Sequence, residues 1–174
     1  MATAHTIIRA ASPADLAAIR DLFLEYAQAL TVGTDETSAG VHMSLNHQGF
    51  ERELETLPGR YAPPTGTLLF ATLDASPVAC GALREIPALP TDLGRVCELK
   101  RMYVRPIARG KGIGRAIAMN LLDFARNAGY TIAKLDTEPT FIEAVTLYRS
   151  LGFTETDRYN DDPVPCTMFM AKVL

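Results

Sequence analysis

Residues 96–115 read VCELKRMYVRPIARGKGIGR, and this stretch decides how we expect the chain to fold. Positions 96–104 form an apolar run typical of a strand, and the apolar spacing over residues 112–128 is typical of a helix. The turn between them is rich in glycine. No acidic residue lies between positions 100 and 115, whereas six are basic: Lys100, Arg101, Arg105, Arg109, Lys111 and Arg115. The sequence therefore predicts a helix whose N-terminus is surrounded by positive charge.

The turn Arg109-Gly110-Lys111-Gly112-Ile113-Gly114 has the composition of an anion-binding loop. Glycines let successive N–H groups point toward one place, and a helix N-terminus adds partial positive charge, which together suit a pyrophosphate. The alternative is a glycine-rich turn with a solvated basic rim. A Walker loop is excluded because Gly112 stands where Ser or Thr is required, and the dinucleotide fingerprint because Arg115 replaces a glycine. No GxSxG hydrolase motif occurs.

The rest of the chain alternates between strand and helix patterns. Ser12, Pro13 and Asp15 mark a helix start, and apolar residues then follow at helical spacing up to Leu30. A mobile loop is expected over residues 31–49. The predicted strands are 6–9, 67–73, 78–84, 96–104, 131–135, one beginning at Phe153, and 166–174; the other predicted helices are 51–57, 112–128 and 141–151. This order predicts an α/β fold with a sheet of mixed direction.

Composition narrows the function classes. The chain has 174 residues, of which 48% are hydrophobic and 21% charged, as expected for one globular domain spanning residues 1–174. Its net charge of −3 disfavours a duplex nucleic-acid binder. No apolar run reaches the ~20 residues that span a bilayer, and the first residues lack a signal-peptide pattern. With three widely spaced cysteines and no CxxC pair, we expect a reduced, cytoplasmic protein.

At these motifs the chain resembles the GNAT superfamily of acyl-CoA-dependent N-acetyltransferases. Residues 109–114 fit the family pattern Q/R-x-x-G-x-G/A, and residues 99–106 resemble its fourth strand. A second motif, A-x-x-x-Y-x-x-x-G-F, is matched over residues 144–153. The asparagine often found three residues before that alanine is Phe141 here, so no asparagine contact to the cofactor is implied. The resemblance covers nearly the whole chain and implies a single-domain GNAT fold with helices on both faces of the sheet.

The resemblance implies acetyl-CoA as the acyl donor and assigns residues to it. The backbone of Met102, Tyr103 and Val104 would pair with the pantetheine arm like an added strand. The pyrophosphate would be held by the N–H groups of the loop and helix start, namely Arg109, Gly110, Lys111, Gly112, Ile113, Gly114 and Arg115. The Arg109 side chain could instead brace the loop.

Two residues are candidates for the chemistry, which needs a neutral amine and a proton for the leaving thiolate. Tyr148 matches the tyrosine that often donates this proton or orients the sulfur in the family, and the alternative is an aromatic side chain packed between helix and sheet. Glu98 matches the general base of some members, and a plain ion pair with Lys100 or Arg101 is the alternative. Strict strand alternation would place Cys97, Leu99 and Arg101 on one face and Glu98, Lys100 and Met102 on the other.

The histidines and Cys97 are not expected to form a functional site. His42 and His47 fall in one loop and His5 is remote, so no metal site is expected. Cys97 is explained as a buried small hydrophobe.

Three function classes follow from these patterns. The leading hypothesis is direct acetyl transfer from acetyl-CoA to a primary amine of a small molecule or peptide. A non-catalytic acyl-CoA sensor on the same fold is the alternative, and an interaction scaffold is disfavoured by the intact loop. No nucleic-acid or membrane partner is expected, and a homodimer is left open.

The acceptor can be addressed only through charge. Two segments expected to border its cleft carry eight acidic residues against three arginines; the acids are Asp35, Glu36, Glu51, Glu53, Glu55, Asp157, Asp161 and Asp162. Such a field would attract a protonated amine, while the basic loop attracts the pyrophosphate. The alternative is that these acids simply solvate loops. The charge pattern thus favours a small cationic amine.

Overall fold

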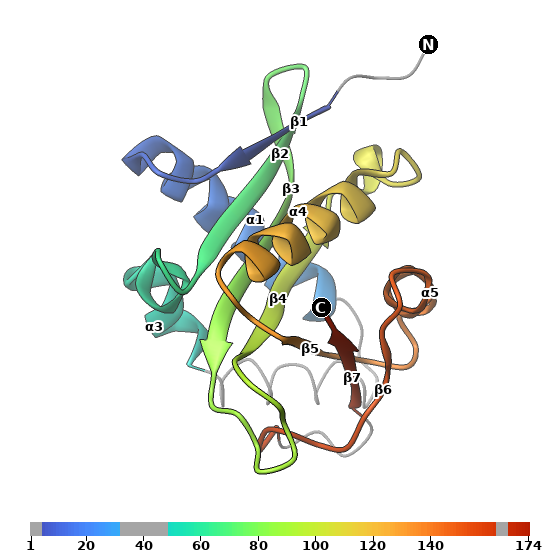
Figure 1. The fold of residues 1–174 in the computed structure, drawn as a ribbon. Coiled ribbons are helices and arrows are strands. Elements are labelled where there is room, and N and C mark those ends of the chain that lie inside the picture. Colours follow the sequence, from blue (N-terminus) through green and yellow to red (C-terminus); the bar gives the residue numbers. More distant parts are fainter. Residues whose placement is uncertain (1–4, 32–48, 163–166) are drawn as a thin grey trace.

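The computed structural model describes residues 5–31, 49–162 and 167–174, in which one mixed sheet is the central element (Figure 1). Its seven strands lie in the order β1-β2-β3-β4-β5-β7-β6, and only β4 and β5 are parallel neighbours. Their bounds are β1 His5–Arg9, β2 Thr67–Leu73, β3 Ser76–Ile86, β4 Val96–Val104, β5 Ile132–Thr137, β6 Thr154–Glu155 and β7 Met168–Val173. The prediction of a mixed α/β sheet is confirmed.

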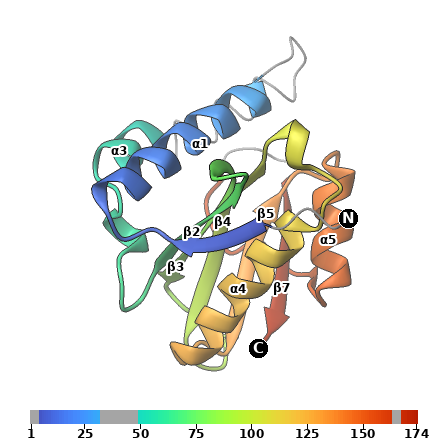
Figure 2. The ribbon, with the colours of Figure 1, turned by 90° about the horizontal axis from the view of Figure 1, so that it is seen from above.

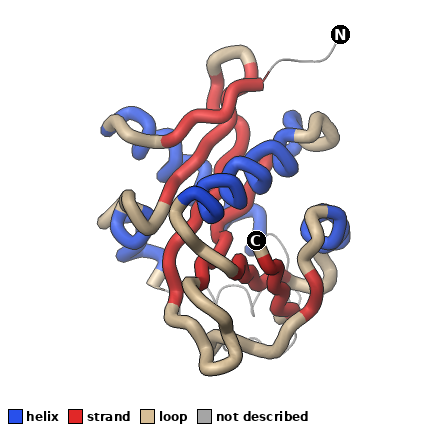
Figure 3. The backbone as a smooth tube through the Cα atoms, in the orientation of Figure 1, coloured by secondary structure: helices blue, strands red, loops and turns tan. Residues whose placement is uncertain are grey.

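Helices cover both faces of this sheet, as Figure 2 shows from above. The helix α1 (Pro13–Thr31) and the short α3 (Phe50–Glu55) lie on one face, and α4 (Ile113–Asn127) lies on the other. The helix α5 (Ile142–Ser150) lies beside the C-terminal strands, and two short 3₁₀ turns, Gly59–Tyr61 and Pro106–Ala108, complete the described elements. Figure 3 shows the same alternation of helices and strands along the chain.

Two hydrophobic clusters fill the spaces between the sheet and its helices. The α4 face contains Ile113, Ile117 and Leu121, all at most 1% exposed, against strand residues such as Leu83 and Leu99. The α1 face contains Ile19, Leu22 and Phe23, packed against Phe70 and Cys80. Because alternate strand residues point to opposite faces, β2, β3 and β4 contribute to both clusters. A central strand such as β4 is therefore held on both sides.

Local signals account for the ends of the main elements. Ser12 begins α1 as predicted: its Oγ accepts a hydrogen bond from the N–H of Asp15 at 3.1 Å, and its own N–H donates to the Asp15 carboxylate at 2.9 Å. This reciprocal pair satisfies two N–H groups at the helix start. The predicted bounds of β2 and β4 are confirmed, and the other elements shift by a few residues at their ends. The predicted loop over residues 31–49 lies largely outside the described residues.

The alternation of side chains along β4 breaks at Arg101. Arg101 adopts a left-handed backbone with φ of 56°, and the register with β3 shifts between Cys80 and Ala82. Arg101 therefore turns to the α3 side, where Glu53 accepts its Nε hydrogen bond at 2.7 Å, and Met102 turns to the α4 side. The expectation that Arg101 shares a face with Leu99, and Met102 with Glu98, is wrong because the bulge inserts an extra residue.

Candidate active site

A cavity of about 650 Å³ opens where β4 and β5 diverge. These parallel strands pair only over Val96–Glu98 and Ile132–Lys134, after which β4 stays with β3 and β5 with β7. The walls of the cavity come from the end of α1, the second half of β4, the loop into α4, the end of β5 and the start of α5. Its size lies within the ~300–1,000 Å³ typical of ligand sites.

The β4 wall offers free backbone groups to this cavity. Met102, Tyr103 and Val104, the residues assigned to the pantetheine arm, all line it. In the described part of the chain, no strand pairs with β4 on this side beyond Glu98. The Tyr103 ring packs edge-on against Tyr26 of α1, with ring centroids 6.3 Å apart, and so fixes this wall. An extended ligand could add to this edge as a further strand would.

The glycine loop completes the same wall at the N-terminus of α4. Gly110 and Gly112 have φ values of 72° and 76°, which side chains other than glycine rarely adopt, and Gly112 is the residue that precedes the helix. The first N–H groups of a helix have no partner within it, and among the described residues no acceptor faces the N–H groups of residues 110–112. Unpaired N–H groups at a helix start are suited to bind an anion, which is the role that the sequence predicts for this loop.

The three basic side chains of the loop behave differently. Arg109 donates from Nε to the carbonyl of Val104 at 3.0 Å, which is the bracing role left open by the sequence. Arg115 lines the cavity and donates to Ser150 Oγ at 2.8 Å, which links α4 to the end of α5. Lys111 is exposed and does not line the cavity, unlike the other residues assigned to acetyl-CoA.

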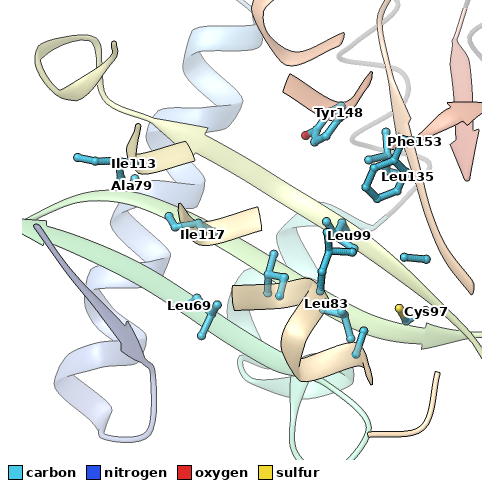
Figure 4. Packing of buried hydrophobic residues seen from close by; sticks show 14 of the residues in the cluster. Leu69, Ala79, Leu83, Cys97, Leu99, Ile113, Ile117, Leu135, Tyr148 and Phe153 are labelled. Atoms are coloured by element: carbon cyan, nitrogen blue, oxygen red, sulfur yellow. The ribbon is translucent and has the colours of Figure 1, made fainter. Parts of the chain in front are cut away.

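Tyr148 lies in the cavity wall opposite the β4 edge. Its ring packs edge-on against Phe153 with centroids 5.9 Å apart, and Figure 4 shows both rings near Leu135. The Gly152 backbone, with φ of 87°, lets the Phe153 N–H reach back to the Tyr148 carbonyl at 3.0 Å. The Tyr-to-Gly-Phe spacing of the second motif thus fixes the tyrosine on α5.

The chemical state of Tyr148 follows from its burial. Only 6% of the residue is exposed, and this burial raises the pKa of its phenol above the ordinary value of 10.0. Its hydroxyl forms no hydrogen bond with any of the described residues, which leaves that group available to a ligand. The phenol is therefore protonated at neutral pH, as a proton donor must be.

Glu98 lies in a buried ion-pair network and does not line the cavity. Its carboxylate accepts hydrogen bonds from Arg84 Nε at 2.8 Å and from the Tyr159 hydroxyl at 3.0 Å, and it lies 3.4 Å from Lys100 Nζ. This environment favours the ion-pair interpretation of Glu98 over the general base. Lys100 is a partner as expected, whereas Arg101 pairs with Glu53, and Arg84 was not among the expected partners.

The network continues from Lys100 to the end of β5. Lys100 Nζ lies 2.9 Å from Asp136 Oδ1, and Asn160 donates to Asp136 Oδ2 at 3.1 Å. Burial opposes ionisation of Asp136, but the Lys100 charge and these two hydrogen bonds prevail and lower the pKa of the carboxyl below 3.8. Asp136 and Lys100 both line the cavity as a neutralised pair.

The structure also adds residues that the motifs did not mark. Three further carboxylates line the cavity: Glu138, Glu143 and Asp162. Of the eight acids expected to border the acceptor cleft, Asp162 is the one that the described residues place in the wall, and Glu53 is paired with Arg101. Asp35, Glu36, His42 and His47 lie outside the described residues. The signal that could have identified Glu138 in the sequence is its position as a polar residue directly after a buried strand.

The described residues lack two further features. No helix among them is long and apolar enough to cross a membrane. Within the same ranges, no group of three or more His, Cys, Asp or Glu side chains is placed to hold a metal ion.

Known proteins resemble this chain in sequence and in fold. The family model described as the acetyltransferase (GNAT) family matches residues 20–153. An uncharacterized N-acetyltransferase of Schizosaccharomyces pombe is 34% identical over 128 residues, which cover 74% of this chain and 76% of that protein. An IAA acetyltransferase of Azospirillum brasilense is 36% identical over 123 residues, covering 70% and 74% of the two chains.

A solved structure extends the likeness to the whole fold. The YncA protein of Salmonella typhimurium, solved with its cofactor acetyl-CoA, matches with a TM-score of 0.65 over 98% of this chain and 94% of that chain, at 21% identity. A family match over most of the chain, two motifs on one cavity and a shared fold agree. The chain belongs to the acetyltransferase (GNAT) family.

Proposed function

We propose that this acetyltransferase transfers the acetyl group of acetyl-CoA to a primary amine of a small molecule or peptide, by direct attack of the amine on the thioester. The observation that carries the proposal is that the free β4 edge, the glycine cradle and the Tyr148 side chain line one cavity. Each of the three supplies a different requirement: an edge for an extended arm, a cradle for a pyrophosphate and a proton for a leaving thiolate.

The backbone of Met102, Tyr103 and Val104 is suited to bind the pantetheine arm. The pyrophosphate would then receive hydrogen bonds from the N–H groups of residues 110–115. In this arrangement the Arg109 side chain contributes by holding the loop to Val104, not by binding the phosphates itself. Arg115 lines the cavity and adds positive charge on the phosphate side.

Direct attack, without an acyl-enzyme, is supported by the state of the described cysteines. Cys80 and Cys97 are completely buried, and neither lines the cavity. Burial raises the pKa of both thiols, that of Cys97 to about 12, so neither is a thiolate at neutral pH. Cys166 lies outside the described residues. The amine itself is then the nucleophile, and Tyr148 protonates the departing sulfur.

The charge distribution favours a cationic acceptor. Arg109 and Arg115 line the cavity at the loop, whereas the cations at the opposite side, Lys100 and Arg101, are each paired with a carboxylate. The Glu138 carboxylate adds negative charge there. A protonated amine is attracted to this side and an acidic acceptor is repelled.

A panel of amines, amino acids, polyamines and peptides, assayed by release of the CoA thiol, tests the proposal. We expect turnover with cationic primary amines and thermal stabilisation by CoA. A sensor would show stabilisation without turnover, and a scaffold would show neither. Absence of turnover throughout the panel, with CoA bound, would contradict the proposed reaction.

A further inference from the structure

Glu138 is the first residue after β5, at the point where β4 and β5 have separated. Its side chain is half-buried and lines the cavity that also contains Tyr148. The hydroxyl of Thr167, just before β7, donates to Glu138 Oε1 at 3.2 Å. One carboxylate oxygen is therefore anchored to the C-terminal strand, and the group is held at the wall of the cavity.

No lysine or arginine forms a salt bridge with Glu138 in the described part of the chain. All 17 lysine and arginine residues of the chain fall within the described ranges, and none of them forms a salt bridge with Glu138. Lys100, which also lines the cavity, is taken up by Asp136 and Glu98. This separates Glu138 from Glu98, whose charge is balanced by two basic residues.

Most of the influences on Glu138 favour the protonated form of its carboxyl. Burial is the largest influence and raises the pKa of the carboxyl above its usual 4.5, and the charges of Asp162 and Asp136 raise it further. The Thr167 hydrogen bond acts in the opposite sense but is outweighed. The exposed Glu143 of α5 adds a further carboxylate to the cavity wall. A bound cation would relieve this accumulation of negative charge.

From this geometry we propose that Glu138 receives the ammonium group of the acceptor and is the general base that takes its proton. The inference rests on the proposed acetyl transfer and assigns a catalytic residue that the motifs did not mark. Glu138 thus takes the general-base role for which Glu98 was a candidate, because Glu98 is buried among its own partners and does not line the cavity.

The proton balance then closes with two residues of this chain. The acceptor R–NH₃⁺ gives one proton to the Glu138 carboxylate, which passes it to solvent after the turnover. The neutral amine forms a C–N bond to the thioester carbonyl carbon, and the C–S bond breaks. The leaving sulfur takes a proton from the Tyr148 hydroxyl, and Tyr148 regains one from the nitrogen as the amide forms. The nitrogen loses two protons, of which one appears on CoA and one in solution.

This assignment also restricts the acceptor. A carboxylate next to the reacting amine would lie near Glu138, and Lys100, which lines the same cavity, is already paired with Asp136. Like charges repel each other in a partly buried site. The inferred acceptor is thus a cationic amine without a neighbouring carboxylate, and free α-amino acids should be poorer acceptors.

The experiment compares wild type and Glu138→Gln with two small acceptors, ethylamine and the weakly basic trifluoroethylamine. Only ethylamine needs its proton removed at neutral pH. We expect kcat/KM for ethylamine to fall by ~10²-fold or more in Glu138→Gln, and kcat/KM for trifluoroethylamine to change by only a few-fold. The ethylamine defect should also shrink as the pH is raised. Glu138→Asp, which retains a carboxylate, should recover part of the rate.

Two controls separate this role from a structural one. Glu155→Gln removes an exposed carboxylate that pairs with Arg149 outside the cavity, and it should leave both rates unchanged. Stabilisation by CoA should be the same in all variants, which shows that the fold and the cofactor side are intact.

The possible failures are distinguishable. Equal losses with both amines, or a Glu138→Gln rate within twofold of wild type, would overturn the role of Glu138 and leave the acetyltransferase proposal standing. If wild-type protein acetylates neither these amines nor any amine of the panel, the proposed function falls and the assignment of Glu138 with it.

Discussion

Replacing Tyr148 with phenylalanine removes one hydroxyl from the cavity wall and leaves the ring in place. The ring keeps its packing against Phe153. Tyr148 belongs to the hydrophobic cluster on the α4 side of the sheet, where only 6% of the residue is exposed. Within the described residues this hydroxyl has no recorded hydrogen-bond partner that would be left behind. We therefore expect Tyr148→Phe to change the free energy of unfolding by less than ~1 kcal/mol.

The effect on the reaction should be much larger. A positioned general acid typically contributes 10²- to 10⁴-fold, which corresponds to roughly 3–5 kcal/mol of transition-state stabilisation. We expect kcat to fall by ~10²-fold, while KM for acetyl-CoA changes by only a few-fold, because the hydroxyl acts on the leaving sulfur and not on the pyrophosphate. The assay is thiol release at saturating amine.

A second tyrosine provides the matched control. The Tyr130 hydroxyl donates to the carbonyl of Thr65 at 2.6 Å, and Tyr130 does not line the cavity. Tyr130→Phe should thus cost about 1 kcal/mol of stability, since it leaves a carbonyl without its donor, and should not change kcat. A Tyr148→Phe rate within twofold of wild type would refute the proton-donor role and leave Tyr148 as a packing residue.

Three further outcomes are expected. Gly112→Val should abolish most of the thermal stabilisation by CoA. Gly49→Val should retain it, although Gly49 precedes α3 with a similar φ of 69° against 76°. An equal stabilisation by CoA in both variants would reject the anion-binding role of the loop. Arg101→Leu should lower the free energy of unfolding in urea by ~3 kcal/mol because Glu53 loses its buried partner, and an unchanged value would contradict this pairing. Because the folded protein lowers the pKa of Asp136, the ionised carboxylate stabilises the fold at pH values above its ordinary pKa of 3.8, and this contribution is lost as the pH falls through the lower pKa of the folded state. Asp136→Asn should therefore make the free energy of unfolding less dependent on pH in that acidic range. An unaltered pH profile would argue against the pairing of Asp136 with Lys100.

Much of the fold could be predicted because its signals are local. The apolar run of β4 and the helical spacing of α4 each lie within one short window, and the predicted bounds of β4 match the structure. The glycine turn between them has the composition that its left-handed φ values require. Tyr148 could also be placed, because the Gly152-Phe153 helix end is a short-range motif.

The orientation of side chains along β4 could not be predicted in the same way. Alternation fails at Arg101, and the contacts that hold the bulge come from Glu53 and Phe50, which lie about fifty residues earlier in the chain. Two partners of Glu98 also come from other parts of the chain: Arg84 on β3 lies 14 residues away and Tyr159 lies 61 residues away. The family resemblance thus made Glu98 a candidate base with an ion pair as the alternative, and the tertiary contacts of its carboxylate favour the ion pair.

The charge of the acceptor side shows the same limit. Counting acids in two loops pointed to a cationic amine, but the count included Glu53, which is neutralised by Arg101, and omitted Glu138, which lines the cavity. Whether a carboxylate acts on a ligand depends on its partner and its place in the wall, and both are set by the divergence of β4 from β5.

The most direct measurement is product analysis by mass spectrometry after the protein is mixed with acetyl-CoA, with and without a cationic primary amine. Direct transfer in this cavity predicts an N-acetylated amine in amounts equal to the free CoA formed, and no acetyl group on the protein when the amine is left out. Acetylated protein that passes its acetyl group to the amine, or CoA release without any acetylated amine, would contradict the account.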